Sequence, residues 1–253
     1  MADGTWQGTL SVQGQALKFN FTVGNKAGQP FVELINAGER ITIPAEDITY
    51  YGDSVRIVMH IFDSELRAKV AATQLTGLYS KNYADYTLPF EAQFGETNRV
   101  VKADPEAEVA ILQQRYMVQF DHEGDLTPAI GEFSQQGNYV VGTFLTETGD
   151  YRFLEGGITN TNELTLTTFD GNHAFVFQAK IEDDQLTEGH FYSGATWHET
   201  WTATADPDAR LRDANTLTYL KEGYDGIAFA FPDTNGDTVR LSDRKYQDKV
   251  VIL

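Results

Sequence analysis

The sequence lacks cysteine altogether, which excludes disulfide scaffolds, thiolate metal sites and cysteine nucleophiles. It also lacks any apolar run near the ~18 residues that a membrane-spanning helix needs. Basic residues are scarce: 19 Lys and Arg stand against 37 Asp and Glu, for a net charge of −18. So acidic a chain repels phosphate backbones, and no basic cluster favours an anionic membrane surface. We therefore expect no nucleic acid partner and no transmembrane segment in this chain.

A signal peptide is missing too, because Met1-Ala2-Asp3-Gly4 leads directly into strand-like sequence. We expect either a cytoplasmic chain or one whose export signal has been removed. No G-x-S-x-G, Walker or G-x-G-x-x-G motif occurs, so the sequence offers no nucleophile elbow and no phosphate cradle.

What the chain does contain is typical of a folded protein. Apolar residues make up 41% of its 253 residues and aromatic residues 12%, enough for one large or two ordinary domains. Leu17, Phe19, Phe21 and Val23 alternate strictly with other residues, which is the period of a strand. Turn signals recur roughly every 8–12 residues, which predicts an antiparallel barrel or sandwich.

The stretch from Leu164 to Ala203 predicts three consecutive strands, and its landmarks occur earlier in the chain. The separations are 107 residues from Phe62 to Phe169, 111 from Gln74 to Gln185 and 113 from Ser80 to Ser193. The segments 6–10 and 38–41 are likewise echoed by 116–120 and 149–153. These repeats predict an internal duplication of an all-β unit of about 110 residues.

The duplication predicts two tandem antiparallel meander lobes, over residues 4–99 and 112–206, and leaves barrel and sandwich open. Residues 97–114 would link the lobes. Within them Asp104-Pro105-Glu106 has the composition of a helix start, although the apolar residues that follow could equally begin a strand. A second short helix is predicted over residues 216–222, ending at Gly223.

Residues 226–253 differ from the rest. The pattern predicts a strand over 226–231, a turn over 233–237 and an apolar strand over 249–253 of the kind that lies inside a sheet. This segment resembles the opening hairpin and first central strand of a thioredoxin-like domain of the TlpA and peroxiredoxin-like type. The matching residues are Phe231-Pro232-Asp233, Gly236, Val239-Arg240-Leu241-Ser242-Asp243 and Lys249-Val250-Val251. The sequences over 142–152 and 169–175 look like the β-rich N-terminal region of some envelope TlpA-family disulfide reductases.

The resemblance implies that residues 226–253 are the truncated start of a thioredoxin-like domain, with the family's Trp-Cys-x-x-Cys motif beyond Leu253. The whole protein would be a periplasmic or cell-envelope thiol-disulfide oxidoreductase that exchanges disulfides with protein partners. The β lobes would position the redox domain or bind a partner. This chain would be inactive alone, would use no cofactor and could self-associate through its apolar end. The alternative is a stand-alone β-barrel binding module for a small apolar or sugar ligand.

Candidate ligand-binding residues lie on the three predicted strands between 164 and 203. The histidines sit on neighbouring strands and could converge, although no H-x-H or H-E-x-x-H spacing occurs. The aromatic residues could form a ligand platform in a barrel mouth, but such residues are more often core. The candidates are Trp197, Trp201, Tyr192, His173, His190 and His198.

The acidic residues supply the remaining candidates. Asp150, Glu155, Asp170 and Glu199 could form a carboxylate pair for acid–base chemistry, but acids in so negative a chain more often form solvated faces. Residues 233–237 are similar to a calcium loop, but Thr238 and Arg244 stand where that loop needs glycine and a bidentate acid. The sequence thus assigns no catalytic residue and no metal ligand.

Overall fold

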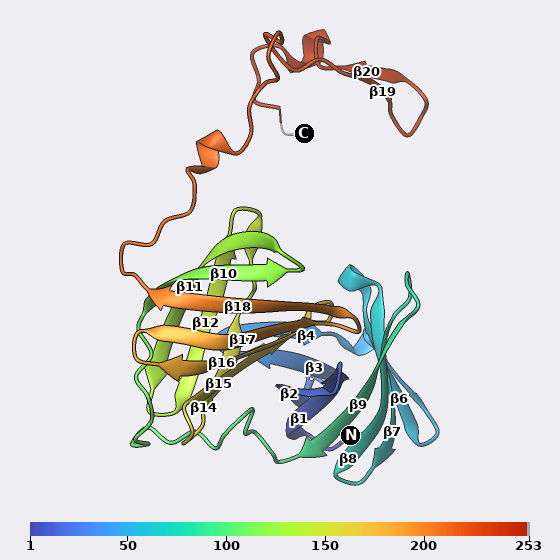
Figure 1. The fold of residues 1–253 in the computed structure, drawn as a ribbon. Helices are drawn as coiled ribbons and strands as arrows, with labels where there is room; N and C mark the ends of the chain where they lie inside the picture. The colour runs from blue at the N-terminus through green and yellow to red at the C-terminus, as the bar shows by residue number, and fades with distance from the viewer. Residues whose placement is uncertain (252–253) are drawn as a thin grey trace. The chain divides into compact units, whose positions relative to one another are not determined.

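The computed structural model of the chain describes residues 1–251 and divides into two units, Met1–Leu211 and a second unit that begins at Arg212. The first unit holds two antiparallel sheets, which are the two lobes seen in Figure 1. None of the helical segments within residues 1–251 is long and apolar enough to cross a membrane.

Lobe 1 is a nine-stranded sheet in the order β4-β3-β2-β1-β9-β8-β7-β6-β5. Its strands curl into a nearly closed barrel in which β4 and β5 are the two edges. The strands are β1 (Gly4–Val12), β2 (Gln15–Lys26), β3 (Gln29–Asn36), β4 (Glu39–Ile43), β5 (Ile48–Tyr51), β6 (Ser54–Met59), β7 (Ser64–Ala71), β8 (Gln74–Lys81) and β9 (Tyr86–Phe94).

Lobe 2 repeats this strand order and closes its ring. Pairing of β12 with both β11 and β14 completes a barrel of eight strands, and the two-residue β13 lies beside β12. The strands are β10 (Arg115–His122), β11 (Asp125–Gln136), β12 (Tyr139–Thr146), β13 (Gly149–Asp150), β14 (Leu154–Ile158), β15 (Glu163–Phe169), β16 (Ala174–Glu182), β17 (Gln185–Ser193) and β18 (Trp197–Ala205). The all-β prediction with two antiparallel lobes is confirmed, and both lobes are barrels.

The lobes differ in closure because of the strand that follows the second hairpin. In lobe 1, β4 pairs with β3 from Val32 to Asn36 and so occupies the edge that closure would need. In lobe 2, β13 takes only two residues of β12, which leaves Tyr139–Gly142 to pair with β14. One strand's length therefore decides between an open and a closed ring.

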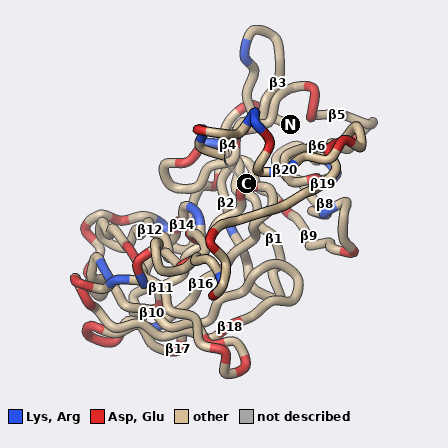
Figure 2. Tube along the Cα trace, turned by 90° about the horizontal axis from the view of Figure 1, so that it is seen from above, with Lys and Arg blue, Asp and Glu red and all other residues tan. Residues whose placement is uncertain are grey.

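Strand alternation sends apolar side chains into each barrel. In β2, Leu17, Phe19, Phe21 and Val23 are all buried, as their period of two predicts. The interior of lobe 2 is filled by aromatic rings in mutual contact, including Phe120, Phe144, Phe177, Phe191 and Trp201. Acidic residues lie mainly at turns and strand ends (Figure 2). The two barrels are therefore packed cores with solvated rims.

Two helix predictions are wrong. The linker from residue 95 to 114 has only a turn at Pro105-Glu106, because its polar backbone groups bond to side chains of the lobes instead. Asn138 donates to the Lys102 carbonyl and Gln135 accepts from Leu112 N–H. In the region of residues 216–222, only the 3-10 turn η3 (Ala214–Thr216) forms, capped by Asp213, and the next residues are not helical.

The second unit carries one hairpin, formed by β19 (Ala230–Pro232) and β20 (Thr238–Arg240). Its turn is held by Asp233, whose carboxylate accepts from Asn235 and Asp237 N–H. The strand predicted over 226–231 is thus three residues long and shifted toward Pro232. The apolar strand predicted at 249–253 is not formed at 249–251, where no neighbouring strand offers a partner among the described residues, and residues 252 and 253 lie outside that description.

Candidate functional site

The end of β15 and the loop that follows it join the two lobes, because Phe169, the last residue of β15, lies in the core of the other barrel. Phe169 belongs to lobe 2 by sequence, yet its fully buried ring packs against Phe19 at 4.6 Å and Tyr79 at 5.0 Å in lobe 1. The Gly171 carbonyl accepts hydrogen bonds from Ser64 and Tyr79. We call residues 169–173 the plug loop, because they complete the lobe 1 core.

Glycine is required within the plug loop. Gly171 has φ +98°, and a Cβ atom there would lie 2.9 Å from the Met59 sulfur. A side chain at this position would therefore meet both backbone strain and a packed neighbour. Phe62, which the sequence repeat aligns with Phe169, lies instead in the 3-10 turn η2 (His60–Phe62) and is only half-buried. The residue that ends β6, where Phe169 ends β15, is Met59, which is buried in the core of its own lobe.

A buried arginine from the linker lies at the same junction. The Arg99 guanidinium contacts Glu155 at 3.3 Å and donates to Thr167 and to the Asn36 side chain at 3.1 Å. Glu155 also accepts from Ala37 N–H at 2.6 Å. Burial lowers the pKa of Arg99 while the Glu155 charge acts in the opposite direction. The residues held here come from both lobes, so Arg99 fastens one barrel to the other.

Asp170 forms a second polar cluster on the plug loop. Its carboxylate contacts His173 Nδ1 at 2.8 Å and Arg152 Nε at 3.1 Å. Burial raises the pKa of Asp170, but hydrogen bonds from the His173 ring and from the backbone of His173 and Asn172 outweigh it, so the pKa lies below its usual value. Arg152 also forms an ion pair with Glu39 in lobe 1.

The carboxylates considered for acid–base chemistry are therefore occupied by structural partners. Glu155 pairs with Arg99 and Asp170 with His173, while Asp150 accepts from Arg152 N–H and Glu199 from the Trp197 indole. Such partners hold lobes and loops in place.

The three histidines do not share one site. His190 and His198 meet on the outer face of β17 and β18, with Nδ1 of His190 3.0 Å from Nε2 of His198. His173 lies instead in the plug loop, where its contacts are with Asp170, Asn172 and Phe175. The prediction that histidines on neighbouring strands converge is therefore correct for His190 and His198. It is wrong for His173, which lies at the lobe junction.

The predicted aromatic platform is divided between surface and core. Trp201 is buried in lobe 2, and Tyr192 is half-buried against the lobe 1 core. Trp197 is 46% exposed and stacks on the His122 ring at 3.9 Å. Only Trp197 remains available to a ligand, so no continuous platform forms.

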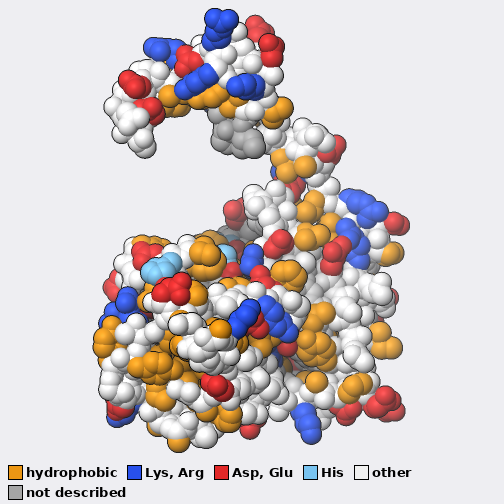
Figure 3. All heavy atoms as spheres, turned by 180° about the vertical axis from the view of Figure 1, so that it is seen from behind, with side chains coloured by type: hydrophobic (Ala, Val, Ile, Leu, Met, Phe, Trp, Pro, Cys, Tyr) orange, Lys and Arg blue, Asp and Glu red, His pale blue; other side chains and the backbone are white. Residues whose placement is uncertain are grey.

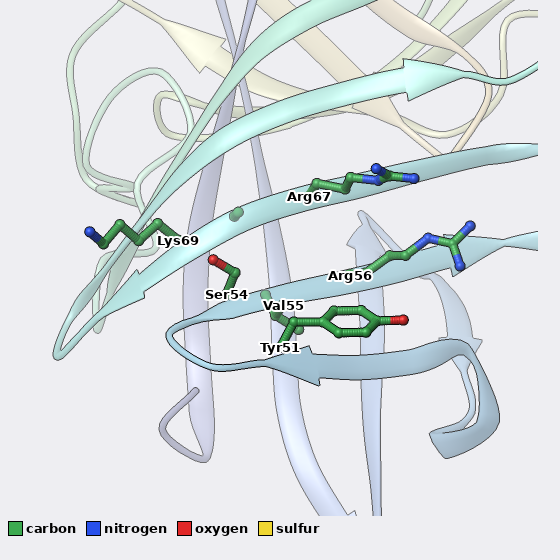
Figure 4. Close-up of a pocket in the computed structure, with 7 residues that line it drawn as sticks. Tyr51, Ser54, Val55, Arg56, Arg67 and Lys69 are labelled. Atoms are coloured by element: carbon green, nitrogen blue, oxygen red, sulfur yellow. The ribbon is translucent and has the colours of Figure 1, made fainter.

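The larger hollows lie on the barrel exteriors. A groove of about 1140 Å³ runs beside the linker, β11 and β12, with exposed Phe153 and Ile111 among its lining residues. A smaller hollow of about 440 Å³ lies over β5, β6 and β7 (Figure 4). There Arg56 and Arg67 both contact Glu65, which neutralises one of the two cations. No cluster of three or more metal-ligating side chains occurs within residues 1–251.

Three residues that join the lobes were not identified from the sequence. They are Arg99, Arg152 and Phe169. Arg99 follows Asn98 in a linker rich in polar residues, so nothing in the sequence marks its charge as buried and paired. Nothing in the sequence indicates which barrel receives Phe169.

Comparison with known proteins identifies no family for this chain. No protein-family profile matches the chain, and no curated protein matches it significantly. Among solved structures, the chain is similar to a Bacteroides fragilis protein described as a "putative outer membrane protein", at 11% identity and a TM-score of 0.28. That match covers 79% of this chain and 95% of the other. It is too distant to assign a family.

Proposed function

We propose that the chain is the non-catalytic β region of a cell-envelope thiol-disulfide oxidoreductase and carries the start of its thioredoxin-like domain. The observation that supports this most is the second unit. Its hairpin pairs Phe231 with Val239, at the place where the family's opening hairpin is expected. The apolar side chains of this unit are left in solvent, with Ile227 59%, Phe231 65% and Val250 96% exposed. Such residues need a larger core to cover them.

The double barrel would serve as a rigid platform in that protein. Phe169 and Arg99 join the lobes through buried contacts, and both lobes belong to one compact unit. A platform of this kind presents a redox domain to its partner in a restricted set of orientations. Disulfide exchange itself would fall to two cysteines beyond Leu253, because a thiolate must attack the disulfide and this chain has none.

The test compares this chain with the protein that the native gene encodes, in an insulin-reduction assay with dithiothreitol. We expect the gene to continue into a Trp-Cys-x-x-Cys motif, the longer protein to reduce insulin, and this chain to match buffer. A control with both cysteines changed to serine should also match buffer. A gene that continues without a cysteine pair, or turnover by this chain, would refute the proposal.

A second candidate, a binding module for a small apolar ligand, is favoured by the groove beside β11 and β12. Exposed Phe153 and Ile111 line it, and its volume of about 1140 Å³ is sufficient for a ligand of drug size. A fluorescent apolar probe should bind the chain and lose affinity in Phe153→Ser. Tyr51→Ser is the matched control, because Tyr51 is exposed on lobe 1, away from this groove. This variant should bind the probe as tightly as the unchanged chain does.

A further inference from the structure

The outer face of lobe 2 carries a pair of histidines that no part of the proposed function uses. The register of β17 and β18 places His190 opposite Thr200 and His198 opposite Tyr192, so the two histidines are diagonal neighbours on one face. Nδ1 of His190 lies 3.0 Å from Nε2 of His198, and the ring planes differ by 23°. A hydrogen bond joins the two rings across this gap.

That separation matches two nitrogen ligands of one metal ion. Metal–imidazole bonds are about 2.0–2.1 Å, so ligands at a right angle stand roughly 2.9 Å apart and tetrahedral ligands roughly 3.3 Å apart. The observed 3.0 Å is close to the right-angle value. A cation can therefore replace the shared proton after a small turn of the rings. We propose that His190 and His198 form a binding site for a divalent transition metal ion.

The surroundings hold the rings and leave room for the metal. The Tyr192 ring lies 4.7 Å from His198 and 6.0 Å from His190, which limits their rotation. Beside His190 a hollow of about 410 Å³ extends over Gly189, with Asp121 and Glu188 among its lining residues. Water can complete the coordination from this side. Acidic side chains are scattered over the face of the molecule that Figure 3 shows, in keeping with the negative charge of the chain.

Charge also favours a cation here. The chain carries a net charge of −18, which raises the local concentration of divalent cations around it. Asp121 adds a carboxylate within the same hollow, where it can bond to metal-bound water. The Glu188 carboxylate also lines the hollow, and it pairs with Lys180 at 2.7 Å, which neutralises that cation.

The geometry points to Cu²⁺ as the preferred ion. Right-angle nitrogen ligands suit the tetragonal coordination of Cu²⁺ and Ni²⁺ better than the tetrahedral coordination of Zn²⁺. Copper also binds nitrogen ligands most tightly among these divalent ions. Because the described residues supply only two nitrogens, water fills the other positions, and the ion remains accessible from solvent.

The experiment is a Cu²⁺ titration of the intact chain near pH 7.5, followed by calorimetry and by electron paramagnetic resonance. We expect one Cu²⁺ per chain with a spectrum of two nitrogen ligands, and a weaker response to Ni²⁺ and Zn²⁺. His190→Gln and His198→Gln should each weaken binding at least about tenfold. His60→Gln is the matched control, since that exposed histidine pairs with Asp47 in lobe 1.

A second measurement needs no variant. Substoichiometric Cu²⁺ should broaden the ring resonances of His190 and His198 in nuclear magnetic resonance before those of His60 and His173. Equal broadening of all histidines would mean an adventitious ion only and would overturn the proposal. So would unchanged affinity in the His190 and His198 variants. Neither result bears on the redox proposal, because the site lies wholly within lobe 2.

Discussion

Truncating the plug residue, Phe169→Ala, tests whether lobe 1 depends on lobe 2 for its core. Removing a buried phenylalanine side chain costs about 3–5 kcal/mol. Here the ring is fully buried and touches two aromatic partners at 4.6 and 5.0 Å, each of which adds about 0.5–1.5 kcal/mol beyond the area buried. We therefore expect the upper part of that range. Since native domains are stable by about 5–15 kcal/mol, the loss is a large share of the total.

Two assays locate the loss. Urea unfolding measures the change in the free energy of unfolding, and hydrogen exchange by mass spectrometry reports each lobe separately. Peptides from β1 and β2 should exchange about 10³ times faster or more in Phe169→Ala, since each ~1.4 kcal/mol is a factor of ten. Phe62→Ala, at the half-buried counterpart, is the control and should cost less than ~1 kcal/mol. A loss below ~1 kcal/mol for Phe169→Ala, or faster exchange confined to lobe 2, would refute the plug.

Three further outcomes are expected. Arg99→Ala should cost about 3–5 kcal/mol in urea unfolding, because it leaves Glu155 buried without its cation; a loss below ~1 kcal/mol would contradict this. The pKa of His198 is lowered by burial and then by His190, so the unfolded chain binds more protons and stability should fall as pH drops below about 6.5. Thermal melts of His198→Gln should show a weaker fall, and an identical slope would contradict the assignment. Deleting residues from Gly226 onward should leave both barrels folded by circular dichroism and reduce self-association in light scattering; unfolded barrels would place that segment in the β domain.

The architecture could be predicted from local pattern because the alternation of residues along a strand indicates which of its side chains are buried. Alternation in Leu17–Val23 placed four residues in the core, and the spacing from Phe62 to Phe169 indicated the repeat. Barrel closure could not be predicted, since it depends on how many residues of β12 are left free by β13. Because β13 and β14 compete for the same strand, closure depends on several segments together and cannot be read from any one of them.

The candidate site was less accessible from sequence. Adjacent strands brought His190 and His198 together as expected, but one residue of register decides which face a side chain takes. Trp201 is consequently in the core while His198 points outward. The helix predicted at Asp104 failed for a different reason: a capping motif is local, and the side chains of Asn138 and Gln135 offered the linker backbone better partners.

The plug loop also delays completion of the lobe 1 core while the chain is being synthesised. Lobe 1 ends its last strand at Phe94, but Phe169 is synthesised 75 residues later. At about 5–20 residues per second, a ribosome needs roughly 4–15 s to cover that distance. During this interval lobe 1 lacks the ring that fills its interior, and its sheet has two unpaired strand edges at β4 and β5. The nascent chain is therefore most prone to mispairing just before its second half arrives, and a chaperone that shields strand edges would act in that window.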